Sequence, residues 1–408
     1  MCLTEVRPAN STTGYAAKSM GKRELLLIVG FVLAGAVLYQ AMAPPSGPND
    51  RGLSLSRLLD RARREIRGNR AAADLARTTI YPVAPDVTEL RLSGVTELQV
   101  TGEDREDVEA DLRVHSMAYD EAEARRFAEE TRLKEDRPAG SLALSVSYPE
   151  GRQSGRQRTS LTLKIPARLR VRVEGSASKL GVTGVEAVEL LNIRGETTVK
   201  NTAGRVAINH RNGQVVVDGA AAVKLTGRDS EVTLGRVRGD LSIVMEGGGR
   251  LQASAPPGAV DVESRNAEIT LQDLSATRGP IRVNAVGGAL TLEGVGAETR
   301  IDGRNARIAV ALSAAAPVVI YSEGADVVLT PPGAGYRLDA VAVEGRIDPE
   351  ATAALGLERS TADEDREQRA SGDVNGGGPT ISVRTRRSDV VLRSAKEEGP
   401  VDSTPRGR

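Results

Sequence analysis

The chain has 408 residues and carries 55 Lys plus Arg against 55 Asp plus Glu, so its formal net charge is zero. This balance lacks the basic excess typical of nucleic-acid binding, and no nucleic-acid partner is expected. Aromatic residues make up only 2% of the chain and the one cysteine is Cys2, which disfavours an aromatic sugar-stacking groove and excludes disulfides in the main part of the chain.

The N-terminal region predicts a single membrane anchor. Residues 1–24 are interpreted as a cytoplasmic tail. Residues 25–43 form the run LLLIVGFVLAGAVLYQAMA, which as a helix rising about 1.5 Å per residue nearly spans a hydrocarbon layer of about 30 Å. The alternative is a cleaved signal peptide ending at Ala41-Met42-Ala43, which the length of the run and the following Pro44 disfavour.

The charges beside this predicted transmembrane helix give conflicting evidence on its orientation. Lys18, Lys22 and Arg23 precede the helix and favour a cytoplasmic N-terminus, whereas five arginines between residues 51 and 64 favour the reverse. Because an N-terminal anchor before a large domain usually exports that domain, we expect a single-pass protein of the inner (cytoplasmic) membrane. Its C-terminal domain would then lie on the periplasmic or extracytoplasmic side.

Residues 44–77 are interpreted as a linker followed by a basic juxtamembrane helix. Pro44, Pro45 and Pro48 make the linker short and stiff. The Leu- and Arg-rich residues 53–75 then predict a helix, which either lies on anionic lipid headgroups or stands in solvent as a stalk.

Residues 78–170 predict a β-rich cap that contains one helix. Asp120 and Glu123 have the spacing of a capping box, which predicts a helix with Ala124, Phe127 and Ala128 toward the core. We expect this region to cover the first open strand edge of the domain that follows. Alternating apolar residues mark strands at 90–92, 98–100, 108–114, 142–146 and 161–165, and a further strand at 169–173 leads into the next region.

Residues 171–393 repeat one short phrase, an apolar–polar–apolar triplet followed by a polar or Gly-rich corner. Triplets such as Val232-Thr-Leu234 and Ile269-Thr-Leu271 start about every 9.3 residues between 171 and 338. This period predicts an all-β fold, a parallel β-solenoid (β-helix) in which two apolar side chains of each strand face inward and one residue faces outward. Thr197 and Thr299 occupy inward positions and are the weakest points of the pattern.

The period alone leaves open whether a coil has two or three strands. Arg-Asn pairs stand at three corners, at 211–212, 265–266 and 304–305. The strands that follow these corners are separated by even numbers of strands. This favours two strands per coil, because only then do all three corners lie on one edge.

The pattern is interrupted near its C-terminal end. Asp348 and Pro349 predict the start of a short helix, and the charged, Gly-rich residues 359–378 predict a mobile insertion. The phrase returns at Ile381-Ser-Val383 and Val390-Val-Leu392 as a last coil beyond the insertion. Residues 394–408 are interpreted as a disordered tail.

The repeated phrases, the lead-in Leu161-Thr-Leu-Lys-Ile-Pro166 and the segment GGGPTISVRTRRSDVVL (376–392) resemble a known group of sequences. They look like the bacterial domain-of-unknown-function families labelled putative adhesins, whose relatives include putative autotransporter adhesin head domains. The resemblance covers roughly residues 87–393. It implies a β-solenoid fold and an envelope or surface setting, and it brings no catalytic residue set.

Few residues in the repeat are candidates for chemistry. His115 and His210 are the only histidines, so a His-based zinc site or Ser-His-Asp catalysis would need one of them, and each is predicted to be structural or solvated. Gly247-Gly-Gly249 lacks the following helix and Lys of a phosphate loop and is interpreted as a corner.

A polysaccharide lyase or hydrolase is the sharpest enzymatic alternative, and it would need carboxylates gathered on one face. The candidates Asp261, Glu263, Asp302 and Asp326 are spread along the repeat. No catalytic, cofactor-binding or metal residue and no cofactor is therefore predicted.

The sequence thus predicts a non-enzymatic, membrane-anchored β-solenoid of the cell envelope that acts as an adhesin-like binding or structural module. The alternatives are an envelope sensor or regulator that works with a membrane partner and, less favoured, a polysaccharide-processing enzyme. The expected partners are the membrane, through the anchor and through contact of the basic helix with anionic lipid, and an envelope protein or polysaccharide.

Overall fold

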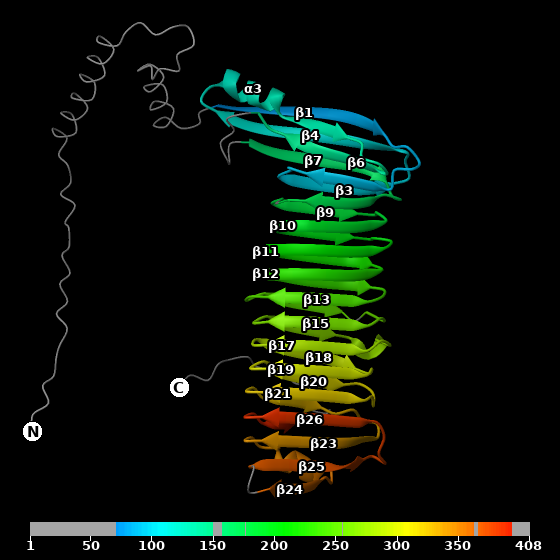
Figure 1. The fold of residues 1–408 in the computed structure, drawn as a ribbon, viewed down its shortest axis with the longest axis vertical. Coiled ribbons are helices and arrows are strands. Elements are labelled where there is room, and N and C mark those ends of the chain that lie inside the picture. The colour runs from blue at the N-terminus through cyan, green and yellow to red at the C-terminus, as the bar shows by residue number, and fades with distance from the viewer. Residues whose placement is uncertain (1–70, 150–156, 176, 255, 363–365, 394–408) are drawn as a thin grey trace, which may run out of the picture. The chain divides into compact units, whose positions relative to one another are not determined.

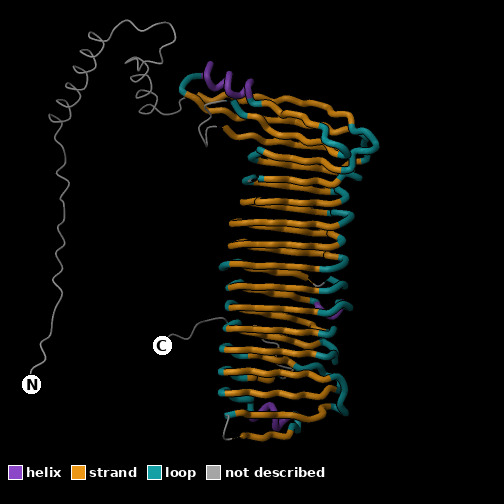
Figure 2. Tube along the Cα trace, in the orientation of Figure 1, coloured by secondary structure: helices purple, strands orange, loops and turns teal. Residues whose placement is uncertain are grey.

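The computed structural model describes residues 71–149, 157–175, 177–254, 256–362 and 366–393. Within these residues the chain is mostly β-strand, and most of the strands pair in parallel (Figures 1 and 2). No helix in the described residues has the length and apolar character needed to cross a membrane. The interpretations of residues 1–24, 25–43, 44–70 and 394–408 lie outside the described residues.

The strands lie in two rows, because each strand of the repeat pairs with the second strand after it and not with the next one. Val232 of one strand, for example, pairs with Leu251, and Leu251 pairs with Ile269, whereas Leu241 pairs with Val260 in the other row. Row A holds β6 (Ser141–Ser147), β2 (Glu89–Ser93), β8 (Arg170–Glu174), β13 (Leu241–Glu246), β15 (Val260–Arg265), β17 (Ile281–Val286), β19 (Thr299–Arg304), β21 (Val318–Glu323) and β26 (Thr380–Arg386). Row B holds β7 (Gln157–Pro166), β3 (Glu97–Glu103), β9 (Lys179–Thr183), β14 (Arg250–Ser254), β16 (Glu268–Gln272), β18 (Ala289–Val295), β20 (Arg307–Leu312), β22 (Val327–Thr330) and β27 (Val390–Leu392).

Three longer strands run through a corner and contribute to both rows. The first half of each lies in row A and the second half in row B, as the two blocks of their parallel pairings show. These strands are β10 (Ala187–Lys200), β11 (Arg205–Ala220) and β12 (Ala222–Val237). A short 3₁₀ helix, η1 (Leu274–Ala276), lies where the sequence has its longest corner, between β16 and β17.

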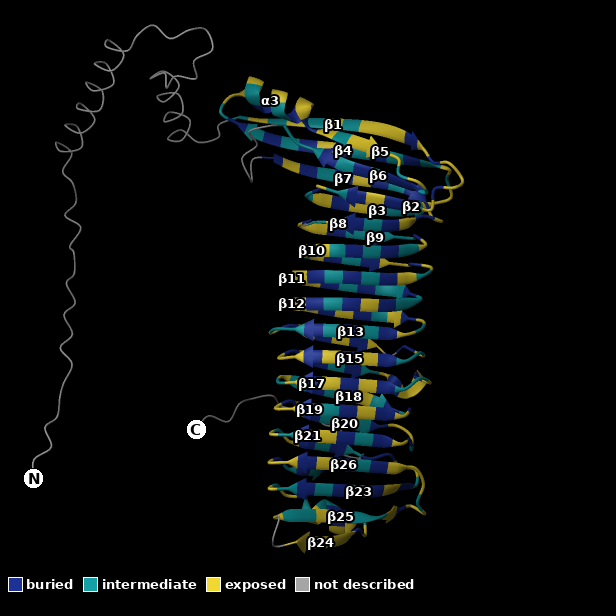
Figure 3. Cartoon of the chain, in the orientation of Figure 1, coloured by how far each residue is buried: buried dark blue, intermediate teal, exposed yellow. Residues whose placement is uncertain are grey.

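The core consists of apolar side chains stacked in columns between the two rows. Each predicted triplet start from 171 to 327 pairs with its counterpart in the same row and is buried, so the indexing derived from the sequence is confirmed over this range. Figure 3 shows the resulting alternation of buried and exposed residues along the strands. Val260 and Val262 are buried and Asp261 between them is exposed. Successive side chains of a strand point to opposite faces, so this alternation assigns each triplet residue to the inside or the outside.

The corners that follow row A share one backbone feature. Asn212, Asn266 and Asn305, the three predicted Arg-Asn corners, have φ angles of 55°, 58° and 52° and lie on one edge, as expected for two strands per coil. Asn and Gly are the residues that adopt this left-handed conformation with least strain. The corner between β17 and β18 uses two glycines instead, Gly287 and Gly288, at φ 69° and 78°.

The N-terminal end of the described domain is closed by antiparallel strands and a helix. β1 (Ala71–Pro82) pairs with β4 (Asp107–Ala118), β4 pairs with β7, and β5 (Arg132–Asp136) pairs with β6. The helix α3 (Glu121–Glu130) lies over β1 and β4, with Ala124 and Ala128 buried and the Asp120 carboxylate accepting the backbone N–H of Glu123 at 2.8 Å (Figure 1). The predicted helix and its capping residue are confirmed.

Two expectations for this end differ from the structure. The juxtamembrane helix predicted for residues 53–75 is wrong for residues 71–75, because these residues begin β1. Ala and Leu favour helix locally, but pairing along the whole length of β4 outweighs that weak preference. β2 and β3, which the sequence placed in the cap region, already belong to rows A and B, because β2 pairs with β8 and β3 pairs with β9.

The pattern is interrupted by a detour between β22 and β26, and the predicted return of the phrase at residues 381–383 and 390–392 is confirmed, but the pairing of the strands within the detour was not predicted. β26 pairs directly with β21, and β27 pairs with β22, so the coil after residue 330 is built from residues 380–392. β23 (Tyr336–Val343), indexed as the next strand of the repeat, instead lies on the far side of β26. Beyond β23 lie β25 (Glu367–Val374) and β24 (Glu358–Ala362), and α4 (Pro349–Ala354) begins at the predicted Asp348 cap.

The expectation of a mobile insertion at 359–378 is wrong for its described residues. Residues 358–362 and 367–374 pair as an antiparallel hairpin on β23. Charged residues mark this segment because it forms the outer strands of row A, where Glu358 and Arg359 are exposed. Charged side chains are a common way to protect such an edge from pairing with other chains.

The two inward threonines lead to opposite expectations on replacement by valine. The Thr197 hydroxyl is buried and has no hydrogen-bond partner among the described residues, whereas the Thr299 hydroxyl donates to the Ala297 carbonyl at 2.9 Å. Thr197→Val should raise the free energy of unfolding by about 1 kcal/mol, and Thr299→Val should lower it by about 1 kcal/mol, since only the second change removes a hydrogen bond. Chemical denaturation of both variants checks this, and a loss of stability in Thr197→Val would contradict it.

Candidate binding groove

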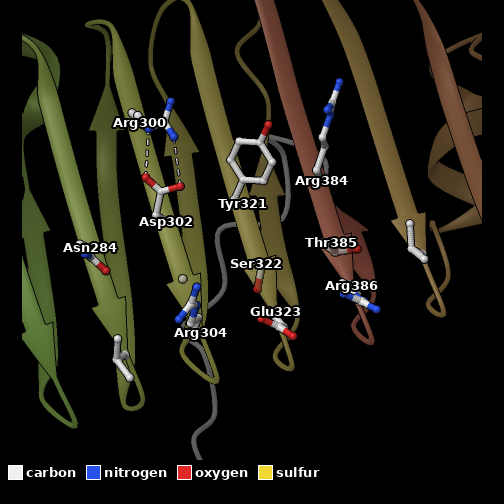
Figure 4. A pocket seen from close by; sticks show the side chains of 13 residues that line it. Asn284, Arg300, Asp302, Arg304, Tyr321, Ser322, Glu323, Arg384, Thr385 and Arg386 are labelled. Carbon is white, nitrogen blue, oxygen red and sulfur yellow. Dashed lines mark hydrogen bonds and ion pairs between the residues drawn. The ribbon is translucent and has the colours of Figure 1, made fainter.

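The outward face of row A holds a groove near its C-terminal end. It extends over β17, β19, β21, β26 and the end of β23 and encloses about 790 Å³. Its outward side chains come from segments far apart in the sequence, because the detour places β26 beside β21. Figure 4 shows the groove with its lining side chains.

An exposed aromatic ring lies at the centre of this groove. Tyr321 is 40% exposed and Val286 is 41% exposed, and with Ile80 they are the large exposed hydrophobic residues of the described chain. Two of these three residues therefore line one groove. In Figure 4, Tyr321 lies between Arg300 and Arg384.

Arg300 is held beside the ring by an ion pair. Its Nε donates to Asp302 at 3.0 Å, two residues along the same strand, and its guanidinium carbon lies 5.9 Å from the centre of the Tyr321 ring, within the range of a cation–π contact. The hydrogen bond that Arg300 donates to the Asp302 carboxylate raises the pKa of Arg300 above its ordinary value. The Tyr321 ring and the Arg300 guanidinium are thus held side by side on the surface before any ligand binds.

Strand register places the remaining charges in two columns. Asp302, Tyr321 and Arg384 are neighbours in one column. The other column holds Arg304, Glu323 and Arg386, and Arg387 forms a salt bridge with Glu323. Neighbours in a column lie about 4.8 Å apart, the spacing of paired strands.

The groove has a surplus of positive charge. It is lined by four arginines and two carboxylates, and both carboxylates are already paired, Asp302 with Arg300 and Glu323 with Arg387. Within the described residues, Arg304, Arg384 and Arg386 form no salt bridge. These three arginines are therefore available to an anionic ligand.

His210 is buried inside the corner of β11 and does not reach the groove. Its Nε2 lies 3.0 Å from the Gly195 carbonyl and its Nδ1 lies 2.9 Å from the Ser230 hydroxyl. Because a carbonyl only accepts, Nε2 carries a proton and donates to Gly195. Burial lowers the pKa of His210, partly opposed by that hydrogen bond.

His115 lies elsewhere, on β4 in the N-terminal cap. Its Nδ1 is 2.7 Å from the Asp74 carboxylate on β1, and the pair is exposed. Asp74 and His115 are directly opposite in the antiparallel pairing of β1 and β4. The two histidines of the chain are thus in separate places, one in the cap and one in the core.

The four carboxylates considered for an enzymatic site do not meet in one place. Asp261 and Glu263 lie on β15, and Asp302 follows Glu263 two strands later in the same column, with Asn284 between them. Asp302 is engaged with Arg300, as described above. Asp326 lies at a corner, where it accepts the backbone N–H of Asp389 at 2.9 Å.

The groove could not be found from the sequence, although one signal pointed toward it. In the triplet pattern Tyr321 occupies an outward position, which is unusual in a chain with so few aromatic residues. Its neighbour Arg384 is 63 residues away in the sequence, and only the detour brings the two together. No motif or spacing in the sequence indicates that Tyr321 and Arg384 are neighbours.

Comparisons with known proteins give structural similarity only. No protein-family description and no curated protein matches the chain. A putative cell adhesion protein from Clostridium sporogenes is 10% identical, with a TM-score of 0.19, and the match covers 78% of this chain and 100% of that one. Putative adhesins from Parabacteroides merdae and Bacteroides fragilis are 9% and 10% identical, each with a TM-score of 0.23 and 78% of this chain covered, and the matches cover 96% and 97% of those chains.

At such identities and TM-scores the similarity does not extend to a shared ligand or role. The groove and its residues are described from this chain alone.

Proposed function

We propose that this chain is a non-enzymatic binding or structural module of the cell envelope. In this proposal residues 89–392 form a β-solenoid with two strands per coil, and the apolar residues 25–43 anchor it in the cytoplasmic membrane with the solenoid on the extracytoplasmic side. The observation that carries the proposal is the groove around Tyr321, in which an exposed ring and three arginines without salt-bridge partners among the described residues share one face.

The parallel rows support this proposal by supplying a stiff base for the groove. Every coil adds buried side chains to the same columns, so the outward side chains of successive strands are held in fixed register. Sites built on strands are held more accurately than sites built on loops. Such a surface suits the binding of a ligand that extends across several strands.

A pull-down from an envelope fraction with the full-length protein in detergent tests the role. Capture of cell-wall or cell-surface polysaccharide is the expected result. Capture of one stoichiometric membrane protein and no such material would favour a sensor or regulator instead. Turnover of a captured polysaccharide that disappears in Asp302→Asn would contradict the non-enzymatic assignment.

Protease protection on spheroplasts tests the placement independently. We expect added protease to degrade the domain in spheroplasts without lysis. A domain that is cut only after lysis would show that it faces the cytoplasm, and the proposed location would be wrong.

A further inference from the structure

We propose that the groove around Tyr321 binds an anionic polysaccharide, with the ring contacting a sugar face and the arginines pairing with acidic groups on the sugars. This inference rests on the proposed binding function and names the class of ligand for that site.

The aromatic part of the argument comes from Tyr321 alone, because the low aromatic content disfavours a groove lined by several stacking rings but not a contact with one ring. Tyr321 is 40% exposed on a face where most outward residues are polar or charged, and Val286 adds a second apolar contact to the same groove. Aromatic rings exposed at a binding site combine a large apolar surface with little loss of side-chain entropy on binding. The apolar face of a sugar ring is a suitable partner for such a surface.

The ionic part comes from the arrangement of the free arginines. Arg384 and Arg386 are two residues apart on β26, which separates their Cα atoms by about 6.6 Å. Arg304 and Arg386 are in one column on either side of Glu323, about 9.6 Å apart. Acidic groups spaced by one or two sugar rings along a polymer match this scale, and arginine binds carboxylate and sulfate groups through two parallel hydrogen bonds.

The carboxylates in the groove favour a polysaccharide over a nucleic acid. Asp302 and Glu323 lie among the arginines, and their charges would repel a backbone with a phosphate at every residue. Paired carboxylates can still accept hydrogen bonds from sugar hydroxyl groups. In addition, single-stranded nucleic acids are usually bound by several stacked rings, whereas Tyr321 is the one aromatic residue that lines this groove in the described structure.

Direct binding measurements test this assignment. The full-length protein in detergent is titrated with polygalacturonate oligomers, with neutral dextran oligomers of similar length, with poly-glutamate and with oligo-deoxythymidine. We expect polygalacturonate to bind at least tenfold more tightly than the other three, and its affinity to fall as the salt concentration rises. Tighter binding of poly-glutamate or the oligonucleotide, or equal binding of dextran, would overturn the assignment.

Variants locate the site. Tyr321→Ala and Arg384→Gln should each weaken polygalacturonate binding by tenfold or more, and Tyr321→Phe should stay within about threefold of the unchanged protein because it keeps the ring. Arg282→Gln is the matched control, since Arg282 is an exposed arginine on β17 of the same face that does not line the groove. All four changes are on the surface, and circular dichroism confirms that the variants fold.

The outcomes separate this inference from the proposed function. If envelope material is captured but Tyr321→Ala and Arg384→Gln bind polygalacturonate as well as Arg282→Gln does, the ligand assignment is wrong while the binding role stands. If polygalacturonate binds at the groove but no envelope material is captured, the chemistry of the site stands and the proposed role falls.

Discussion

Gly288→Ala is expected to lower the free energy of unfolding by about 3 kcal/mol. At φ 78° a side chain costs about 1–2 kcal/mol, and the added Cβ would overlap the Ala267 carbonyl oxygen of the neighbouring corner. That oxygen belongs to the backbone and accepts the N–H of Ala289, so it cannot move aside without loss of a hydrogen bond. Chemical denaturation followed by circular dichroism measures the loss.

Gly248→Ala is the matched control for this change. Gly248 is also a corner glycine that follows row A, but its φ is outside the left-handed region and no atom lies within 4 Å of the position a Cβ would take. The control should stay within about 0.5 kcal/mol of the unchanged protein. Equal losses in the two variants would show that the corners respond to alanine in general and that close backbone packing is not the cause.

His210→Gln is expected to change how stability depends on pH. Burial lowers the pKa of His210 below its ordinary value of 6.5, so the folded state prefers the neutral ring. Above pH 6.5 both states are neutral and the proton has no effect on stability. As the pH falls below 6.5 the unfolded state binds the proton first, so stability declines by up to about 1.4 kcal/mol per pH unit until the folded ring is protonated as well.

In the His210→Gln variant this part of the decline should be absent, because the side chain does not titrate. The variant should also be less stable near pH 8, by about 2 kcal/mol, since the hydrogen bonds to Gly195 and Ser230 are disturbed. Thr197→Val serves as the control, because it should displace the whole pH profile without a change of shape. A His210→Gln profile parallel to that of the unchanged protein would contradict the expected role of the buried ring.

Protonation would also change the partners of the Ser230 hydroxyl. With a neutral ring, Nδ1 accepts, and the hydroxyl can donate to it at 2.9 Å. With a charged ring, Nδ1 donates to the same oxygen, and the hydroxyl proton goes to the Arg228 carbonyl, also at 2.9 Å. The corner therefore offers hydrogen-bond partners to both the neutral and the protonated ring of His210. The free-energy cost of protonating the ring comes from its burial away from water.

The columns of the core could be predicted from the sequence because local pattern and tertiary packing agree there. Val232, Ile269 and Val260 recur at a nearly constant spacing, and a period of two within each triplet assigns them to the inside. The even separation of the Arg-Asn corners predicted that all three lie on one edge, and Asn212, Asn266 and Asn305 do all follow strands of row A.

The strand pairing at the two ends of the domain could not be predicted, because it is decided by partners far away in the sequence. Ala71, Ala72 and Ala73 favour helix in isolation and become strand because β4 lies beside them. Leu338 has the right residue type and nearly the right spacing for the next coil, yet it pairs with Ile381, which takes the expected place. Because β26 takes the place expected for β23, Arg384 lies beside Tyr321 and completes the groove. The groove therefore could not be predicted from the spacing of the triplets.

The detour also bears on how the chain can fold during synthesis. A polypeptide emerges from the ribosome with its N-terminus first, and rows A and B can add coils in that order as far as β21 and β22. The strands that cover β21 and β22 are made only after a further 50 or so residues. Until β26 and β27 emerge, the nascent domain exposes the unpaired edges of both rows, and Arg384 reaches Tyr321 only when the last described strands dock.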